Sequence, residues 1–150
     1  MKVVINVCYG GFSLSPLATK KIAELKGKEC YFFKFDLGDE EYKPITIEEA
    51  EKAYIWYAYS VPNPEDYRLN ERDEDGLYKS ANERAEKISL CFRDLDRTDK
   101  ELIKVVEELK NKANGSFAKL KVVTIPDGIK WEIEEYDGNE WISEIHRIWN

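Results

Sequence analysis

The N-terminal segment places two adjacent glycines between an apolar run and a Ser-Pro dipeptide, and this order allows few local structures. Residues 2–9 are rich in Val and Ile and predict a buried strand. Gly10-Gly11 breaks that strand. Ser15 followed by Pro16 is typical of a helix start, with the serine as N-cap and the proline in the first turn. We therefore expect a strand, a glycine loop and a helix in succession.

Further along the chain, turn residues separate short apolar runs and predict an α+β fold that forms one domain over residues 1–150. We expect mixed or antiparallel sheet packed with three to four helices. Strands are predicted at residues 30–35, 42–45, 88–95, 117–125 and 129–134, while residues 53–59 fit either a strand or a helix end. Helices are predicted after Ser15, from the capping boxes Thr46–Glu49 and Thr98–Glu101, and over the C-terminal apolar stripe of Trp141, Ile145, Ile148 and Trp149. The strands at 117–125 and 129–134 flank one tight turn and are expected to pair antiparallel.

Residues 62–87 differ from the rest of the chain, because they hold two prolines, many charges and few large apolar side chains. We expect an exposed excursion from the single domain. Ser80 and Glu83 fit the cap of a short helix within it, and a disordered loop is the alternative.

The formal net charge of −7 argues against binding to nucleic acid polymers or to anionic membranes. A small phosphorylated ligand is still possible, because a few local donors can hold it against an acidic background. No run approaches the ~20 apolar residues of a membrane helix, and no signal peptide is expected. The three cysteines, an odd number, are expected to be buried, reduced side chains of a cytoplasmic protein.

The glycine loop is the strongest candidate for a ligand site. Gly10 and Gly11 let the backbone approach a ligand closely, and the free N–H groups of the following helix start favour an anion. Ser13 and Ser15 add hydroxyl donors. The spacing differs from a Walker loop and lacks its lysine, so an ordinary strand-to-helix turn is the competing interpretation.

A second candidate segment carries two of the chain's six arginines, Arg93 and Arg97, between a predicted strand and a predicted helix. An arginine fork binds phosphate with two hydrogen bonds. The acids Asp94, Asp96 and Asp99 share this segment. They fit surface ion pairs and helix caps, or a magnesium site that a phosphate ligand would complete.

His146 is the only histidine in the chain. A two-histidine phosphodiesterase and metal sites that need two imidazoles are therefore excluded. We expect a packed or capping histidine, with Arg147 either paired to Glu144 or facing a ligand. No catalytic residue, resident metal or cofactor is predicted.

Several motifs resemble one family of small phage proteins. They are MKVVINVCYGGFSLS at residues 1–15, the Arg97-Thr98-Asp99 triplet, VVEEL, ANG, IPDGIKWEIEEYDGNEW and the HR-I-W ending, which together cover roughly half the chain. The family is that of the phage Thoeris anti-defence "sponge" proteins, type one. The charged excursion at 62–87 is longer than the family pattern.

This resemblance implies a protein of the infected bacterial cytoplasm that sequesters cyclic ADP-ribose isomers made by TIR enzymes, without cleaving them. Family members form homodimers, and some form hexamers that also bind cyclic oligonucleotides. Their pockets lie between subunits. Taken with the candidates above, it gives the predicted ligand-binding residues Tyr9, Gly10, Gly11, Phe12, Ser13, Arg93, Arg97, Asp137, His146 and Arg147.

Two other functions stay open at this point. One is a metal-dependent phosphodiesterase or transferase that uses Asp94, Asp96 and Asp99 on a nucleotide-like substrate. The other is a protein that binds and blocks another protein, since aromatic residues suit interfaces. Trp56, Tyr57 and Tyr59 are the aromatic candidates, and they fit a core, an oligomer interface or a base-stacking surface.

Overall fold

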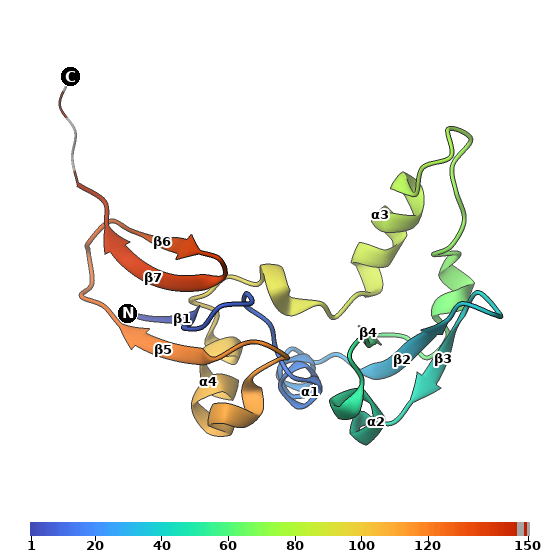
Figure 1. Cartoon of the computed structure of the whole chain (residues 1–150), viewed down its shortest axis with the longest axis horizontal. Coiled ribbons are helices and arrows are strands. Elements are labelled where there is room, and N and C mark those ends of the chain that lie inside the picture. Colours follow the sequence, from blue (N-terminus) through green and yellow to red (C-terminus); the bar gives the residue numbers. More distant parts are fainter. Residues whose placement is uncertain (147–148, 150) are drawn as a thin grey trace. The chain divides into compact units, whose positions relative to one another are not determined.

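The computed structural model describes residues 1–146 and residue 149 of the 150-residue chain. The chain gathers into two compact units. Unit 1 comprises Met1–Ala18 and Phe92–Asn150, and unit 2 comprises Thr19–Cys91. In both units helices accompany antiparallel strands, which confirms the expected α+β class (Figure 1).

Unit 1 contains two strand pairs and one long helix. Its elements are β1 (Lys2–Asn6), η2 (Phe92–Asp94), α4 (Lys100–Leu109), η3 (Lys110–Ala113), β5 (Leu120–Thr124), β6 (Trp131–Tyr136) and β7 (Asn139–Glu144). Strand β1 pairs antiparallel with β5, and β6 pairs antiparallel with β7. Figure 1 shows the β6–β7 hairpin on one side of the β1–β5 pair and α4 on the other.

The core of unit 1 forms because β1 alternates its side chains between the two sides of the pair. Val3 and Ile5 are buried with Ile125, and apolar side chains of β6 and β7 pack against them. On α4, Leu102, Val105 and Val106 recur at helical spacing and are buried where the helix contacts β1 and β5. The hairpin and the helix therefore bury the two faces of one narrow sheet.

The expected pairing between the strands at 117–125 and 129–134 is wrong. The two-residue turn Asp137-Gly138 instead joins β6 to β7, with Tyr136 opposite Asn139. Both turn residues have positive φ, 50° at Asp137 and 84° at Gly138. Such a turn has the twist that antiparallel strands require, and Asp-Gly is among its preferred sequences. The hairpin therefore forms at this turn, and β5 pairs with β1.

The same hairpin replaces the helix expected from Trp141 onward. Trp141 lies in β7 opposite Glu134, and its indole Nε1 donates to that carboxylate at 2.7 Å. The spacing of Trp141 and Ile145 suits a helix, but residues 139–144 pair in register with β6, and these bonds satisfy the backbone groups of the segment that face β6. Ile148, from the same predicted stripe, lies outside the described residues.

Unit 2 is built on a three-stranded antiparallel sheet of order β3-β2-β4. Helix α1 (Pro16–Leu25) begins in unit 1 and continues into unit 2. The other elements are β2 (Tyr31–Asp36), β3 (Glu41–Ile45), α2 (Ile47–Lys52), β4 (Tyr57–Tyr59), η1 (Pro64–Tyr67) and α3 (Lys79–Ile88). Residues 53–59 thus end in a short strand.

Two predicted helix starts are confirmed at the level of their hydrogen bonds. Helix α1 begins at Pro16, and the Ser15 hydroxyl accepts from the amide of Ala18 at 3.1 Å. Helix α2 has the reciprocal capping box, with Thr46 and Glu49 each accepting from the other's amide. These caps satisfy N–H groups that have no partner within the helix.

Two predictions near α4 need correction. The N-cap of α4 is Asp99, whose carboxylate accepts from the Leu102 amide at 2.9 Å, so the expected Thr98 cap is displaced by one residue. The strand expected at 88–95 is absent from the described structure. Ile88 ends α3, and a single bridge between Ser89 and Tyr59 is followed by the short helix η2.

The charged excursion at 62–87 contains η1 and α3. Helix α3 begins at Lys79, so Ser80 lies inside its first turn and is not its N-cap. Among the described residues, no helix has both the length and the apolar composition to cross a membrane.

Candidate functional site

The glycine loop and the Asp137-Gly138 turn meet in unit 1, although more than a hundred residues separate them. The Gly10 amide donates to the Asp137 carbonyl at 3.2 Å. A Cβ placed on Gly138 would lie 2.3 Å from the Gly11 nitrogen, so the two backbones touch in a way that only glycine permits. We call the contact of Gly10-Gly11 with Asp137-Gly138 the glycine junction.

Phe117, from a third segment of unit 1, also packs against the glycine loop. A Cβ on Gly10 would lie 2.7 Å from both the carbonyl oxygen and the Cβ of Phe117. Phe117 itself has a positive φ of 64°, which is uncommon for an aromatic residue. By contrast, a Cβ on Gly11 would meet nothing within 4 Å, so this side of the loop is open to a ligand.

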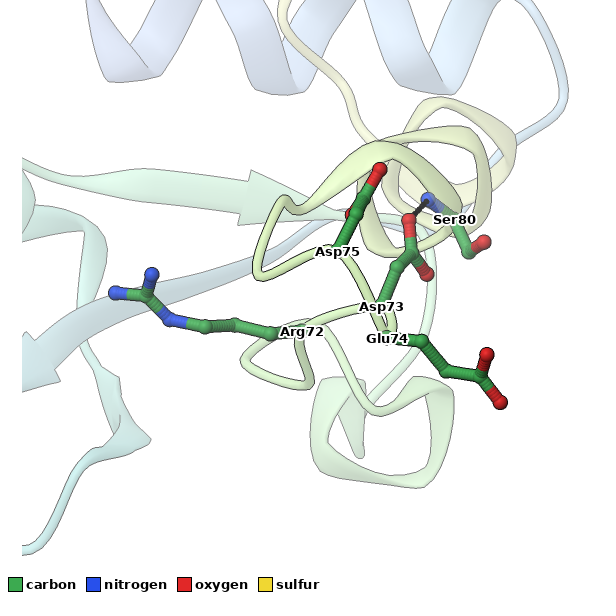
Figure 2. Close-up of a pocket in the computed structure, with 5 residues that line it drawn as sticks. All are labelled: Arg72, Asp73, Glu74, Asp75 and Ser80. Atoms are coloured by element: carbon green, nitrogen blue, oxygen red, sulfur yellow. Dashed lines mark hydrogen bonds between the residues drawn. The ribbon is translucent and has the colours of Figure 1, made fainter.

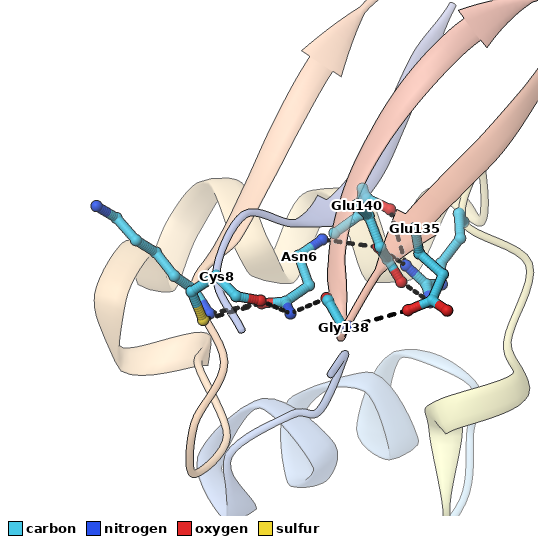
Figure 3. Close-up of polar contacts among 8 residues, drawn as sticks. Asn6, Cys8, Glu135, Gly138 and Glu140 are labelled. Carbon is cyan, nitrogen blue, oxygen red and sulfur yellow. Dashed lines mark hydrogen bonds and ion pairs between the residues drawn. The ribbon is translucent and has the colours of Figure 1, made fainter. Parts of the chain in front are cut away.

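Asn6, at the end of β1, ties the glycine junction together from inside (Figure 3). Its side chain is fully buried, and its Nδ2 donates to the carbonyls of Cys8 at 2.8 Å and Gly138 at 2.7 Å. Its Oδ1 accepts from the Lys119 amide at 2.8 Å. Its own amide donates to the Glu140 carboxylate at 2.8 Å. One side chain thereby fixes the strand end, the loop and the turn.

Glu140 also holds an arginine in a buried ion pair. Both Nη atoms of Arg97 donate to its carboxylate, at 2.7 and 3.0 Å, and the two side chains are only 18% and 10% exposed. Arg97 donates further to the Val4 carbonyl at 3.3 Å. The guanidinium lies 3.6 Å from the ring centroid of Phe12, a cation–π contact. Arg97 thus connects the glycine loop to β7.

The described bonds take three of the five N–H groups that a guanidinium carries. Arg97, one of the predicted ligand-binding residues, lies beside the glycine loop through its contact with Phe12. Its charge, however, already has a counter-charge in Glu140. A phosphate at this site would therefore meet a neutral pair that still has hydrogen-bond donors.

The other predicted site residues are distributed unevenly. Tyr9 is exposed next to the glycine junction, and Phe12 is buried under Arg97. Arg93 is exposed in η2, and His146 is exposed beyond the end of β7. Arg147 lies outside the described residues.

The serine hydroxyls of the loop are engaged within unit 1. Ser13 Oγ donates to the Ser116 carbonyl at 3.2 Å, and Ser15 Oγ donates to the Lys112 carbonyl at 2.6 Å. Gly115 lies so close that a Cβ there would be 2.3 Å from Ser13 Oγ. The second half of the loop is therefore fixed to residues 112–116.

The acids of the Arg93–Asp99 segment serve local structure. Asp96 accepts from the amide and the hydroxyl of Thr98, and these bonds lower the pKa of Asp96 below its ordinary value. Asp99 caps α4. Within the part of the chain that the structure describes, no three His, Cys, Asp or Glu residues are grouped to hold a metal ion.

The three aromatic candidates of unit 2 differ in burial, and only Tyr59 belongs to its core. Tyr59 is buried with Phe33 and Ile88, and its ring lies 5.4 Å from that of Tyr42. Burial raises the pKa of the Tyr59 hydroxyl well above its ordinary value, with a hydrogen bond to Tyr42 as the second cause. Trp56 packs edge-on against Phe32, and Tyr57 alone of the three candidates is borderline exposed.

The cysteines differ from the expectation of uniform burial. Cys91 is exposed, while Cys8 and Cys30 are half-buried. Burial raises the pKa of the Cys30 thiol to about 11, so this side chain stays protonated at neutral pH. The Cys8 thiol donates to the Phe117 carbonyl at 3.1 Å, beneath the glycine junction.

A shallow hollow in unit 2 is lined by Arg72, Asp73, Glu74, Asp75 and Ser80 (Figure 2). Arg72 donates to the Gly76 carbonyl at 3.0 Å and lies over the Tyr78 ring. Three carboxylates against one guanidinium disfavour an anionic ligand. The hollow is better explained as a consequence of how the loop before α3 folds, and not as a ligand site.

Sequence reasoning missed Asn6, Phe117 and Glu140 as residues of this site. The signal for Asn6 was a carboxamide inside an apolar strand run, because buried polar groups need specific partners. Phe117 and Glu140 gave no comparable local signal. Comparison with protein-family models, with curated proteins and with solved structures gives no match.

The buried ion pair gives a stability prediction. Replacing Arg97 by Met or Glu140 by Leu should each destabilise the protein by about 3–5 kcal/mol, because each leaves one buried charge without its partner. The double variant should lose less than the sum of the two. Urea unfolding measures all three. Lys2→Met is the control, since it breaks an exposed ion pair with Glu107 and should cost less than about 1 kcal/mol.

The start of α3 should depend on pH. Hydrogen bonds from the hydroxyl and amide of Ser80 lower the pKa of Asp73 below 3.8. A lowered folded-state pKa means that this stabilisation is present above the unfolded-state pKa and is lost as pH falls through the folded-state value. Protection of the amides in the first turn of α3, measured against their intrinsic exchange rates, should therefore fall as the pH drops below the ordinary aspartate pKa of about 3.9. Asp73→Asn should remove this pH dependence, and Glu74→Gln should leave it unchanged.

Proposed function

We propose that the chain captures a cyclic ADP-ribose isomer at the glycine junction and does not cleave it. The observation that carries this proposal is the meeting of three motifs on which the family resemblance rests. The glycine loop, Arg97 and the Asp137-Gly138 turn lie far apart in the sequence, and in unit 1 both Arg97 and the turn contact the glycine loop.

The chemistry of the glycine junction suits a pyrophosphate. Gly11 faces open space, so a ligand can approach its backbone closely. Arg97 adds the guanidinium N–H groups that its described bonds to Glu140 and Val4 leave over, and Glu140 and the Phe12 ring hold the guanidinium in place. Each charge-assisted hydrogen bond contributes a net ~1.5–3 kcal/mol, so a few of them suffice for tight capture.

Exposed aromatic rings border the glycine junction and suit an adenine base. Tyr9 precedes Gly10, Phe117 lies beneath it, and Tyr136 precedes Asp137. These side chains are 64%, 66% and 70% exposed. Aromatic faces stack with bases, and each stacked base contributes about 1–3 kcal/mol.

Capture without reaction needs tight binding and no general base. The protein would act in the cytoplasm of an infected bacterial cell, where removal of the signal prevents activation of the defence effector. Following the family resemblance, we further propose a homodimer or a larger homo-oligomer, up to a hexamer, with a second subunit completing the pocket. Such a subunit would cover the exposed rings and so raise the buried fraction of the ligand.

Capture predicts recovery of intact ligand. The protein is incubated with the product of a TIR enzyme, washed and denatured by heat. We expect intact signal in the supernatant at one molecule per site, as measured by mass spectrometry. A degraded product would show that the protein is an enzyme. Native mass spectrometry of the same samples gives the number of subunits with and without ligand.

Arg97→Lys should weaken binding of the captured isomer by about tenfold or more in calorimetric titration, because lysine keeps the charge and loses the fork. Thermal unfolding of the variant shows whether the fold is retained. Arg72→Lys is the matched control, since Arg72 also uses its guanidinium on a carbonyl but lies in unit 2. An unchanged affinity for Arg97→Lys would remove Arg97 from the site.

A further inference from the structure

We infer that Asn6 is a positioning residue: it holds the glycine junction closed, and the closed glycine junction is the form that binds ligand. This inference rests on the proposed function for the identity of the ligand. Asn6 is fully buried, and its side-chain nitrogen and oxygen bond to the backbone of Cys8, Gly138 and Lys119. Its effect on a ligand must therefore pass through the backbone segments that it connects.

The bonds of Asn6 fix the glycine loop in two ways. Nδ2 donates to the carbonyls of both Cys8 and Gly138. These two bonds set the distance between Cys8, which precedes the glycine loop, and the Asp137-Gly138 turn. Oδ1 holds the amide of Lys119, two residues beyond Phe117. The side chain of Asn6 is therefore hydrogen-bonded to all three segments that meet at the glycine junction. It donates to two of them and accepts from the third.

Loss of this side chain would free the glycine loop more than it would unfold the strands. Strand β1 keeps its full register with β5, and Val3 and Ile5 keep their apolar contacts. Among the described residues, one hydrogen bond of 3.2 Å, from Gly10 to Asp137, links the loop directly to the turn, together with the close contact at Gly138. Isolated, partly exposed bonds of this kind open more readily than strand pairs.

The closed and open forms of the glycine junction should differ in their affinity for ligand. If only the closed form binds, the apparent dissociation constant rises by the factor by which the closed fraction falls. Asn6→Asp keeps the shape and the acceptor Oδ1 but turns the Nδ2 donor into an oxygen that repels both carbonyls. We expect exchange of the Gly10 amide, followed by NMR, to accelerate by about tenfold or more. Affinity for cyclic ADP-ribose isomers should fall by a matching factor once the closed form becomes the minor one.

The controls separate charge and backbone strain from the positioning effect. Asn111→Asp adds the same charge in unit 1 on an exposed residue of η3, outside the segment 112–116 that holds the loop, so we expect less than a twofold change in either measurement. Gly138→Ala is a second opening variant. Gly128→Ala is its control, because Gly128 has nearly the same φ, 82° against 84°, but a Cβ there meets nothing within 4 Å.

The outcomes distinguish this inference from the proposed function. Equal affinity in Asn6→Asp and the native chain, despite faster exchange at Gly10 that makes the open form predominant, would overturn the positioning role. Unchanged exchange in both Asn6→Asp and Gly138→Ala would overturn the claim that Asn6 closes the junction. If the native chain binds no isomer, the proposed function fails, and the exchange measurements still decide whether Asn6 holds the loop.

Discussion

The carboxylate of Glu140 accepts the Arg97 fork and the Asn6 amide in a place where little water competes, and unit 1 is arranged around this meeting. A charge with so little exposure must be compensated within the protein. The β6–β7 hairpin therefore docks where its carboxylate reaches the end of β1. That position also brings Gly138 onto Gly10-Gly11.

The same arrangement explains how an acidic chain could hold an anion. Glu140 neutralises Arg97 and orients its fork, so the guanidinium acts as a set of directed donors more than as a free charge. Glu135 accepts from the Gly138 amide at 2.9 Å and adds a second carboxylate to the turn. If an anion binds here as proposed, the site would select it by geometry, because long-range attraction is weak and only a ligand that matches the donors gains from them.

Local signals predicted two of the helix starts correctly. Ser15-Pro16 and Thr46–Glu49 start helices as expected, because capping bonds join residues three positions apart. Asp137-Gly138 closes a hairpin, which the sequence did not reveal. Strand pairing depends on contacts between distant segments, and the nearby Pro-Asp-Gly turn offered an equally short connection.

Some residues of the candidate site could be predicted from the sequence, but the hydrogen bonds and ion pairs that join them could not. The glycine loop and Arg97 stood out by residue type, and they do lie together. Asn6 and Glu140 could not be assigned, because a buried polar side chain is explained only by partners that folding brings to it. The predicted phosphate-facing charge of Arg97 is likewise compensated by a residue 43 positions away in the sequence.

Pro44 lies in β3, at one edge of the unit 2 sheet, where it cannot donate a hydrogen bond to a further strand. At the opposite edge, β4 is three residues long, and Ser60 and Leu90 close its outer side through bonds to Ile88 and Ala58. Continuous sheets across two copies of the chain are therefore disfavoured at both edges. Two copies that associate through unit 2 would therefore contact each other through side chains and not through paired strand backbones. The shape and polarity of such a surface can be altered by substitution without disturbing the strands.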